Sequence, residues 1–135
     1  MMNLSRTMKT VNTPAEALLS RLSKQIEDGK IMFGHQDSFL YGHSWKIASD
    51  ATDFNKTDIE AVAGVYPALY GLDLGGIELD SPLNIDKNDF NQMRESVKAH
   101  HERGGVITFS WHPRNPLTGG DTWDTSSTEA VASII

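Results

Sequence analysis

Three short apolar runs in this chain each stop at a polar residue of a kind found in functional sites. The runs occupy residues 30–34, 66–72 and 105–111, and the residues that directly follow them are His35, Asp73 and His112. The runs start about 36 to 39 residues apart with helical patterns between them, which is the rhythm of repeated βα units. Function-bearing side chains of a (β/α)8 barrel lie at the carboxyl ends of its strands. The sequence therefore predicts parallel strands whose ends jointly build one site.

The length of the chain limits how much of a barrel it can form. A full (β/α)8 barrel takes about 250 residues, whereas this chain has 135. Parallel strands must be covered on both faces or closed into a barrel, and domains rarely finish on an apolar stretch such as 129–135. We therefore expect an α/β fold that is the N-terminal part, about three βα units, of a (β/α)8 TIM barrel. Residues 1–12 are expected to form a flexible tail and residues 13–135 an incomplete domain.

Capping residues and apolar spacing predict three helices before and between these strands. They are expected from Thr13 to Gly29, from Thr57 through Val62, and from about Asn88 to Gly104. The residues between the first strand and the second helix read as a long polar loop around Trp45. His100 and His101 fall at the end of the third helix, where a cation interacts favourably with the helix dipole.

Composition and charge exclude several classes of function. The net charge of −6 and the isoelectric point near 5.2 argue against nucleic acid as a partner, because its binders carry a clustered basic surface. A neutral polysaccharide is compatible with this charge. The chain has no cysteine, so neither disulfides nor cysteine-based metal or nucleophile sites are expected. No stretch approaches the roughly 20 apolar residues of a membrane span. The N-terminal residues contain no export signal, which predicts a cytoplasmic location or a signal outside this sequence.

His112 is the strongest single candidate for a functional side chain. It follows a strand and precedes Pro113, so it can donate a hydrogen bond to a substrate hydroxyl or to a catalytic carboxylate. The alternative is a structural histidine bonded to a loop carbonyl. His35 has the same position at the first strand, although Gln36 and Asp37 beside it can instead organise the turn.

Asp73 follows a mostly apolar run, where a buried carboxylate needs a partner. It is expected either to contact sugar hydroxyls or to cap the turn at Gly75 and Gly76 by accepting backbone N–H groups. His35, Asp73 and His112 also have the ligand types of a metal-dependent barrel hydrolase, which stays open as an alternative. No two of them stand at the close spacing of a helical or hairpin ligand pair, so no metal site is predicted.

All three tryptophans lie in or beside the loops at the expected mouth of the barrel. Indole faces bind the C–H faces of pyranose rings. Trp123 shares a glycine-rich loop with Asn115 and is the better sugar platform, whereas Trp111 at the end of a strand is either a core residue or the floor of the site. The predicted substrate-binding set is therefore His112, His35, Trp123, Trp45, Asp73, Trp111 and Asn115.

Five motifs in this order resemble glycoside hydrolase family 26, the β-mannanases. They are Phe33-Gly34-His35-Gln36, Tyr41-Gly42 followed by Trp45, the stretch PALYGLDLGG at 67–76, Ser110-Trp111-His112 followed by Asn115-Pro116, and Thr118-Gly119-Gly120 followed by Trp123-Asp124-Thr125. The resemblance implies that residues 13–135 are an incomplete catalytic domain of this family. It implies a barrel that hydrolyses the β-1,4 bonds of mannan, galactomannan or glucomannan with retention and without a cofactor. By the same resemblance, His112, His35 and Trp123 shape the subsite at the scissile bond. Family members are typically secreted, periplasmic or attached to the cell surface.

The resemblance also implies that this chain lacks the catalytic pair. Retaining glycosidases need two carboxylates about 5 to 5.5 Å apart, and the family places its acid/base glutamate after strand four and its nucleophile after strand seven. Neither strand is expected here, so we expect no catalytic residue in the chain, no hydrolysis and a tendency to aggregate. The alternative from another class is a non-catalytic carbohydrate-binding remnant that keeps Trp123, Trp45 and His112. One departure from the family is Leu72, where relatives often carry an aromatic residue, which implies a different cleft wall.

Overall fold

The computed structural model describes residues 13–127 and 129. The chain forms two compact units, residues 1–32 and residues 33–135, and each is described by itself. The predicted tail at 1–12 and the apolar stretch from residue 130 onward lie outside the described residues. The division into a tail and one incomplete catalytic domain stays a prediction.

The first unit contains helix α1, Pro14–Glu27, at the position that its capping residues predict. The Thr13 hydroxyl accepts the Glu16 backbone N–H at 3.3 Å, and the Glu16 carboxylate accepts the Thr13 backbone N–H at 2.7 Å. Both halves of the capping box are therefore formed. Gly29 follows the helix with a φ of +67°, a left-handed conformation that glycine adopts without strain. The predicted start and stop of this helix are confirmed.

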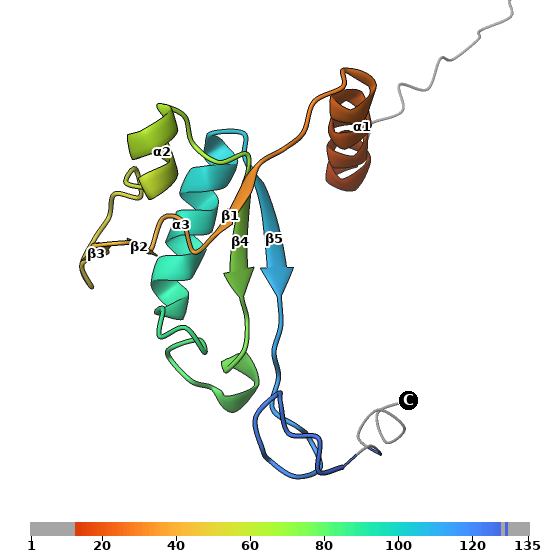
Figure 1. The fold of residues 1–135 in the computed structure, drawn as a ribbon, viewed down its shortest axis with the longest axis vertical. Helices are drawn as coiled ribbons and strands as arrows, with labels where there is room; N and C mark the ends of the chain where they lie inside the picture. The colour runs from red at the N-terminus through yellow and green to blue at the C-terminus, as the bar shows by residue number, and fades with distance from the viewer. Residues whose placement is uncertain (1–12, 128, 130–135) are drawn as a thin grey trace, which may run out of the picture. The chain divides into compact units, whose positions relative to one another are not determined.

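The second unit is built on a parallel sheet of three strands, in the order β1-β4-β5 (Figure 1). The strands are β1 (Gly34–Gln36), β4 (Leu69–Asp73) and β5 (Val106–Ser110). Helix α2 (Asp58–Ala63) precedes β4 in the chain, and helix α3 (Phe90–Glu102) precedes β5. This arrangement confirms the predicted α/β fold of successive βα units.

The first strand begins later than its apolar run predicts. Gly34 is the first residue of β1 and pairs with Leu69, the first residue of β4. The ladder does not extend further back, because Pro67 has no N–H to donate, and Ile31 is 96% exposed. His35 therefore lies inside β1, opposite Tyr70, and not after the end of the strand.

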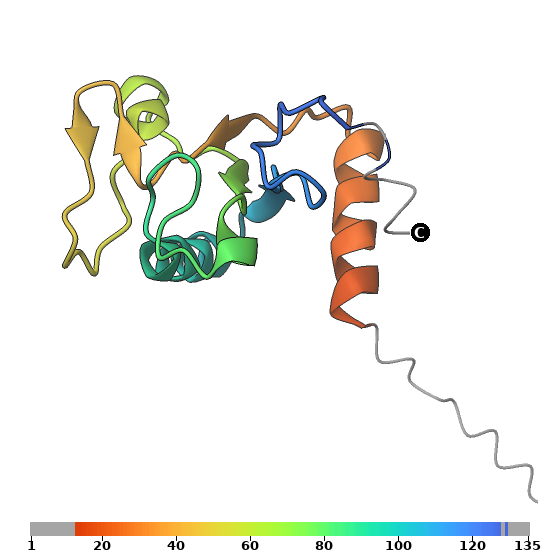
Figure 2. The same cartoon turned by 90° about the horizontal axis from the view of Figure 1, so that it is seen from below.

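One face of the sheet carries the hydrophobic core and is covered by α3 (Figure 2). Tyr70 and Leu72 are fully buried on this face, whereas Asp73 points to the opposite side because successive strand residues alternate. The core cluster consists of Phe39, Leu40, Phe54, Tyr70, Leu72 and Met93. Leu72 is thus a core residue, and the expectation that it alters a cleft wall is wrong.

His100 is buried in the same core. It is 2% exposed, and its ring centroid lies 5.1 Å from that of Phe39 and 5.6 Å from that of Tyr70. Burial lowers the pKa of its imidazole, which favours the neutral ring. The predicted role as a charged partner of the helix dipole is wrong for this residue, because its position on α3 faces the sheet. Gly105 makes room for the ring, since a Cβ atom there would lie 1.9 Å from Nε2 of His100.

The segment between β1 and α2 contains an antiparallel pair of strands where the sequence predicts a loop. The strands are β2 (Tyr41–Gly42) and β3 (Trp45–Lys46), and two residues each are too few to show an alternating pattern. Gly42 approaches Asp58 so closely that a Cβ atom would lie 2.4 Å from the carboxylate. The hairpin is therefore packed tightly against the start of α2.

A short 3-10 helix, η1 (Ile77–Leu79), lies between β4 and α3. The loop that contains it starts at the carboxyl end of the sheet, as does the loop after β5 (Figure 1). Across residues 13–127 and 129, no helix combines the length and the apolar character that crossing a membrane requires.

Candidate functional site

Asp73 is the centre of a hydrogen-bonded group at the carboxyl edge of the sheet. It is the last residue of β4 and is 2% exposed. Its Oδ1 accepts the backbone N–H of Gly75 at 2.7 Å, so the predicted cap of the following turn is confirmed. Its Oδ2 accepts the Ser110 hydroxyl at 2.6 Å and lies 2.5 Å from Nδ1 of His112. One carboxylate therefore joins the ends of β4 and β5.

These donors decide the charge of Asp73. Burial by itself raises the pKa of the carboxyl group, but the hydrogen bonds from Ser110, Gly75 and His112 together hold the pKa below its usual value. Asp73 is therefore ionised at neutral pH. An ionised carboxylate only accepts hydrogen bonds, so Nδ1 of His112 carries a proton. In the neutral imidazole, the other nitrogen, Nε2, is then a hydrogen-bond acceptor.

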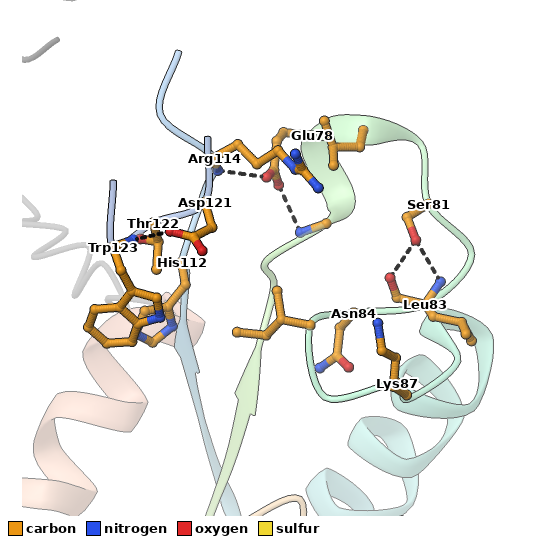
Figure 3. Close-up of a pocket in the computed structure, with 13 residues that line it drawn as sticks. Glu78, Ser81, Leu83, Asn84, Lys87, His112, Arg114, Asp121, Thr122 and Trp123 are labelled. Atoms are coloured by element: carbon orange, nitrogen blue, oxygen red, sulfur yellow. Dashed lines mark hydrogen bonds between the residues drawn. The ribbon is translucent and has the colours of Figure 1, made fainter. Parts of the chain in front are cut away.

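The imidazole of His112 lies next to an aromatic ring. Its side chain is 41% exposed, and no described residue forms a hydrogen bond with Nε2. The ring centroid of Trp123 lies 5.9 Å from that of His112, with 38° between the two planes (Figure 3). Trp123 is 77% exposed. The partner of His112 is a buried carboxylate and not a loop carbonyl, which was the alternative drawn from the sequence.

A pocket of about 320 Å³ opens beside His112 and Trp123 (Figure 3). Its walls come from the loop after β4 and the loop after β5. The polar side chains that line it include those of Glu78, Asn84, Lys87, Arg114 and Asp121. Carboxylate acceptors, an amide and cationic donors beside an indole face suit a ligand with many hydroxyl groups.

Trp111 and Asn115 make contacts within the loops around this pocket. Trp111 is 57% exposed, which rules out a core position, and its indole N–H donates to Glu78 at 3.3 Å. Asn115 donates from its side-chain amide to the Asp124 carbonyl at 3.2 Å and accepts the Leu117 backbone N–H at 3.0 Å. The described contacts of Asn115 therefore organise its own loop.

His35 and Trp45 are not brought into this group. His35 is level with Tyr70, three residues short of Asp73, which is about 10 Å back along the sheet. Trp45 donates its indole N–H to Asp58 at 2.6 Å, and its hairpin lies away from the loop after β5 in both views (Figures 1 and 2).

The described residues contain no group of three histidines or carboxylates that could hold a metal ion. The structure therefore does not bring His35, Asp73 and His112 together as one set of three ligands.

Two residues outside the predicted substrate-binding set take part in the site. Ser110 is the residue of β5 that pairs with Asp73, and its position two residues before His112, on the same face of the strand, was a usable signal. Glu78 accepts hydrogen bonds from Trp111 and from the backbone of Arg114. No sequence pattern pointed to it, because it lies in an irregular loop whose partners are 33 and 36 residues away.

A parallel sheet of successive βα units, with polar side chains gathered at its carboxyl edge, is the architecture of part of a (β/α)8 barrel. The sequence matches the profile of Glycosyl hydrolase family 26 over residues 10–135. The chain belongs to this family, which is a family of β-mannanases.

Three relatives illustrate the likeness and its extent. A mannan endo-1,4-β-mannosidase of Bifidobacterium adolescentis is 32% identical over 96% of this chain and 12% of its own length. The solved family 26 β-mannanase of Bacteroides ovatus is 40% identical, with a TM-score of 0.80 over 92% of this chain and 35% of that one. A modular endo-β-1,4-mannanase of Cellulomonas fimi is 30% identical, with a TM-score of 0.65 over 88% of this chain and 26% of that one. The chain thus spans no more than 35% of any of these relatives.

Proposed function

We propose that this chain supplies the first βα units of a retaining endo-β-1,4-mannanase. The full-length protein that contains these residues, the complete enzyme, hydrolyses mannan, galactomannan or glucomannan by double displacement, without a metal or organic cofactor. Family membership supports this proposal. The observation that carries it for this chain is the His112 ring, held by Asp73 and standing beside the exposed indole of Trp123.

In this proposal the described residues bind and orient the sugar. Nε2 of His112 accepts a hydrogen bond from a sugar hydroxyl, because Asp73 keeps the proton on Nδ1. The indole of Trp123 packs against the C–H face of the same or the neighbouring pyranose ring. A ring held from two sides is oriented for attack before the reaction begins, which is a large part of what a glycosidase must supply.

Bond cleavage in this proposal is carried out by two glutamates outside this segment. A retaining glycosidase needs an acid/base and a nucleophile about 5 to 5.5 Å apart, and the family carries them at the ends of two further strands. The sheet also leaves one edge of β5 open for a further strand, because β4 is its one partner among the described residues. Phe109 on β5 is 55% exposed and is available for packing against such additional elements.

The test is an assay of the complete enzyme on locust-bean galactomannan and on mannohexaose, with xylan as the control substrate and with EDTA in parallel reactions. We expect hydrolysis of both mannans, no comparable hydrolysis of xylan, and the same rate with EDTA. Activity on xylan alone, or loss of activity with EDTA, would contradict the proposal.

Activity and binding measurements on the isolated chain of residues 1–135 distinguish a part of an enzyme from a carbohydrate-binding remnant. Removing one member of a catalytic set already costs several orders of magnitude in rate, so we expect no turnover above a buffer blank. We also expect no heat of binding with mannohexaose in calorimetry. Binding without turnover would favour the non-catalytic carbohydrate-binding function.

A further inference from the structure

Glu78 is the one glutamate of the described residues whose carboxylate bridges the two loops around the pocket. It lies in η1, in the loop after β4. Oε2 accepts the backbone N–H of Gly76 at 3.0 Å and the indole N–H of Trp111 at 3.3 Å, and Oε1 accepts the backbone N–H of Arg114 at 3.0 Å. Figure 3 shows this carboxylate beside the backbone of Arg114, with the hydrogen bond drawn as a dashed line. Glu78 therefore ties its own loop to the loop after β5.

The two donors from the loop after β5 stand on either side of His112. Trp111 precedes the histidine directly, and Arg114 follows it by two residues. Glu78 is exposed. Partial desolvation raises the pKa of its carboxyl group, but the hydrogen bonds that it accepts, among them those from Arg114 and Trp111, hold the pKa below the usual value. The carboxylate is therefore ionised at neutral pH, and charged acceptors form the stronger hydrogen bonds.

Asp73 and Glu78 act on successive residues of the same segment. Asp73 binds the side chains of Ser110 and His112, while Glu78 binds Trp111 and Arg114. The ring of His112 is held through one nitrogen by Asp73, whereas the backbone that carries the ring is held by Glu78. A side chain fixed at one atom still swings when its backbone moves, so both carboxylates are needed to fix where Nε2 points.

We propose that Glu78 is a positioning residue that holds the 111–114 segment, and through it His112, in the orientation that binds substrate. This inference rests on the proposed function, because it assigns Glu78 a part in the same site. The role proposed for Glu78 is exerted through this segment and not on the reacting atoms. It acts by keeping Nε2 of His112 and the indole of Trp123 on the same side of the pocket.

The test replaces Glu78 in the complete enzyme. Glu78→Ala removes both acceptor oxygens and with them all three hydrogen bonds, so we expect kcat/KM on mannohexaose to fall about 10- to 100-fold, the loss typical of a misplaced site residue. Glu78→Gln keeps the size of the side chain but turns an NH₂ group toward at least one N–H donor, and a smaller loss is expected. The matched control is Glu95→Gln on α3, whose carboxylate pairs with Lys98 at 2.9 Å and with Arg94 at 3.3 Å and which is expected to change nothing.

Two further measurements distinguish positioning from a general loss of folding. The melting temperature of Glu78→Gln is expected to stay close to that of the parent. Proton–nitrogen NMR of the imidazole of His112 is expected to show one tautomer, with the proton on Nδ1, in the parent, and broadened or mixed signals in both Glu78 variants.

The outcomes separate the two proposals. A parent enzyme without activity on mannan refutes the proposed function, while the NMR signals of His112 still test Glu78. A parent that is active, with a folded Glu78→Gln variant that keeps both full kcat/KM and the single tautomer, overturns the positioning role. If Glu78→Ala does not fold, the kcat/KM and the NMR signals of Glu78→Gln test the positioning role.

Discussion

Asp37 and Asp73 are two buried aspartates at the carboxyl ends of neighbouring strands, and the pKa values of their carboxyl groups are shifted in opposite directions. Asp37 directly follows β1 and is 0% exposed, while Asp73 ends β4 and is 2% exposed. Burial is the largest single influence on both carboxyl groups and raises the pKa of each. Even so, the pKa of Asp37 is raised to about 6, whereas that of Asp73 lies below its usual value.

The difference comes from the donors around each carboxylate. Asp73 accepts from Ser110, Gly75 and His112. Asp37 accepts from the Tyr41 hydroxyl at 3.1 Å, its Oδ1 has no partner among the described residues, and the charges of Asp86 and Asp73 disfavour its ionised form. Depth alone therefore does not decide whether a carboxylate at this edge is charged; the number of N–H and O–H groups aimed at it does.

The largest expected effect is that of Asp73→Asn in the complete enzyme. The amide has one acceptor oxygen, so it cannot accept from Ser110 and His112 on one side and from Gly75 on the other. Without the charge of the carboxylate the imidazole proton is held less firmly on Nδ1, and Nε2 loses its defined role as an acceptor. We expect kcat/KM on mannohexaose to fall about 100-fold and the free energy of unfolding to fall by about 2 kcal/mol. Steady-state kinetics and urea denaturation measure the two effects.

The control for that variant is Asp53→Asn, at an exposed aspartate with no hydrogen-bond partner among the described residues. It is expected to leave both quantities unchanged. An Asp73→Asn variant with the kinetics of the control would show that the charge of Asp73 does not matter for the site.

Gly75→Ala tests the close packing on the Asp73 side. A Cβ atom at this position would lie 2.7 Å from the His112 carbonyl oxygen, 2.8 Å from Ile85 and 2.9 Å from Oδ1 of Asp73. The backbone has to shift, and we expect a loss of about 2 kcal/mol in the free energy of unfolding. Gly71→Ala in β4 is the comparison, because its added atom meets the flexible end of the Gln36 side chain and is expected to cost less. Equal losses in the two variants would contradict this interpretation of Gly75.

Asp37→Asn tests the other carboxylate, and it is expected to raise the free energy of unfolding where Asp73→Asn lowers it. Because its pKa is raised from 3.8 to about 6, the folded state holds this proton more tightly than the unfolded state does. The carboxyl group therefore favours folding at low pH, and its contribution is lost as the pH rises through about 6. Asparagine tolerates the φ of +51° at this position, and its amide oxygen can still accept from Tyr41.

We expect Asp37→Asn to raise the free energy of unfolding at pH 7 to 8 by on the order of 1 to 2 kcal/mol. The gain should shrink toward zero near pH 4. Melting temperatures of variant and parent between pH 4 and pH 8 measure this. A gain that does not depend on pH would mean that the charge of Asp37 is not its source.

The smallest expected effect is that of Ser110→Ala. This change removes one of the three donors to Asp73 and leaves Gly75 and His112 in place. The pKa of Asp73 should rise toward its usual value, and the free energy of unfolding should fall by about 1 kcal/mol. A carbon NMR titration of the Asp73 carboxyl group follows the shift. An unchanged pKa would remove Ser110 from the explanation given for Asp73.

The parts of the fold that the sequence predicted are those with strong local signals. The capping box at Thr13, the spacing of Phe90, Met93 and Val97, and the polar residues after β4 and β5 each reflect a local physical rule. The first strand was misplaced because an apolar run was taken as the strand itself. Which residues of such a run form a ladder depends on the partner strand, and here Pro67 in the partner segment stops it.

The contacts of the site could be predicted only in part for the same reason. The strand-end rule identified His112 and Asp73, and it left open which groups they would contact. The bond between them, and the bridge from Glu78 to Arg114, join residues more than 35 positions apart. Such contacts follow from the register of β4 and β5, which no local pattern encodes. His35 is of a residue type that suits the site, but it pairs with Tyr70 inside the sheet and so lies too far from the carboxyl edge to take part.

The pairing of Asp73 with Ser110 also favours the correct register of β4 and β5. If β5 slipped by one residue against β4, the neighbour of Asp73 would be Phe109 or Trp111, and a buried carboxylate would face an aromatic side chain in place of a hydroxyl donor. Such an arrangement leaves the charge without a partner, which is costly at this depth. The carboxylate that orients His112 thus also makes a misaligned sheet less stable. A chain in which β5 pairs with β4 in the correct register has therefore already formed the core of its site.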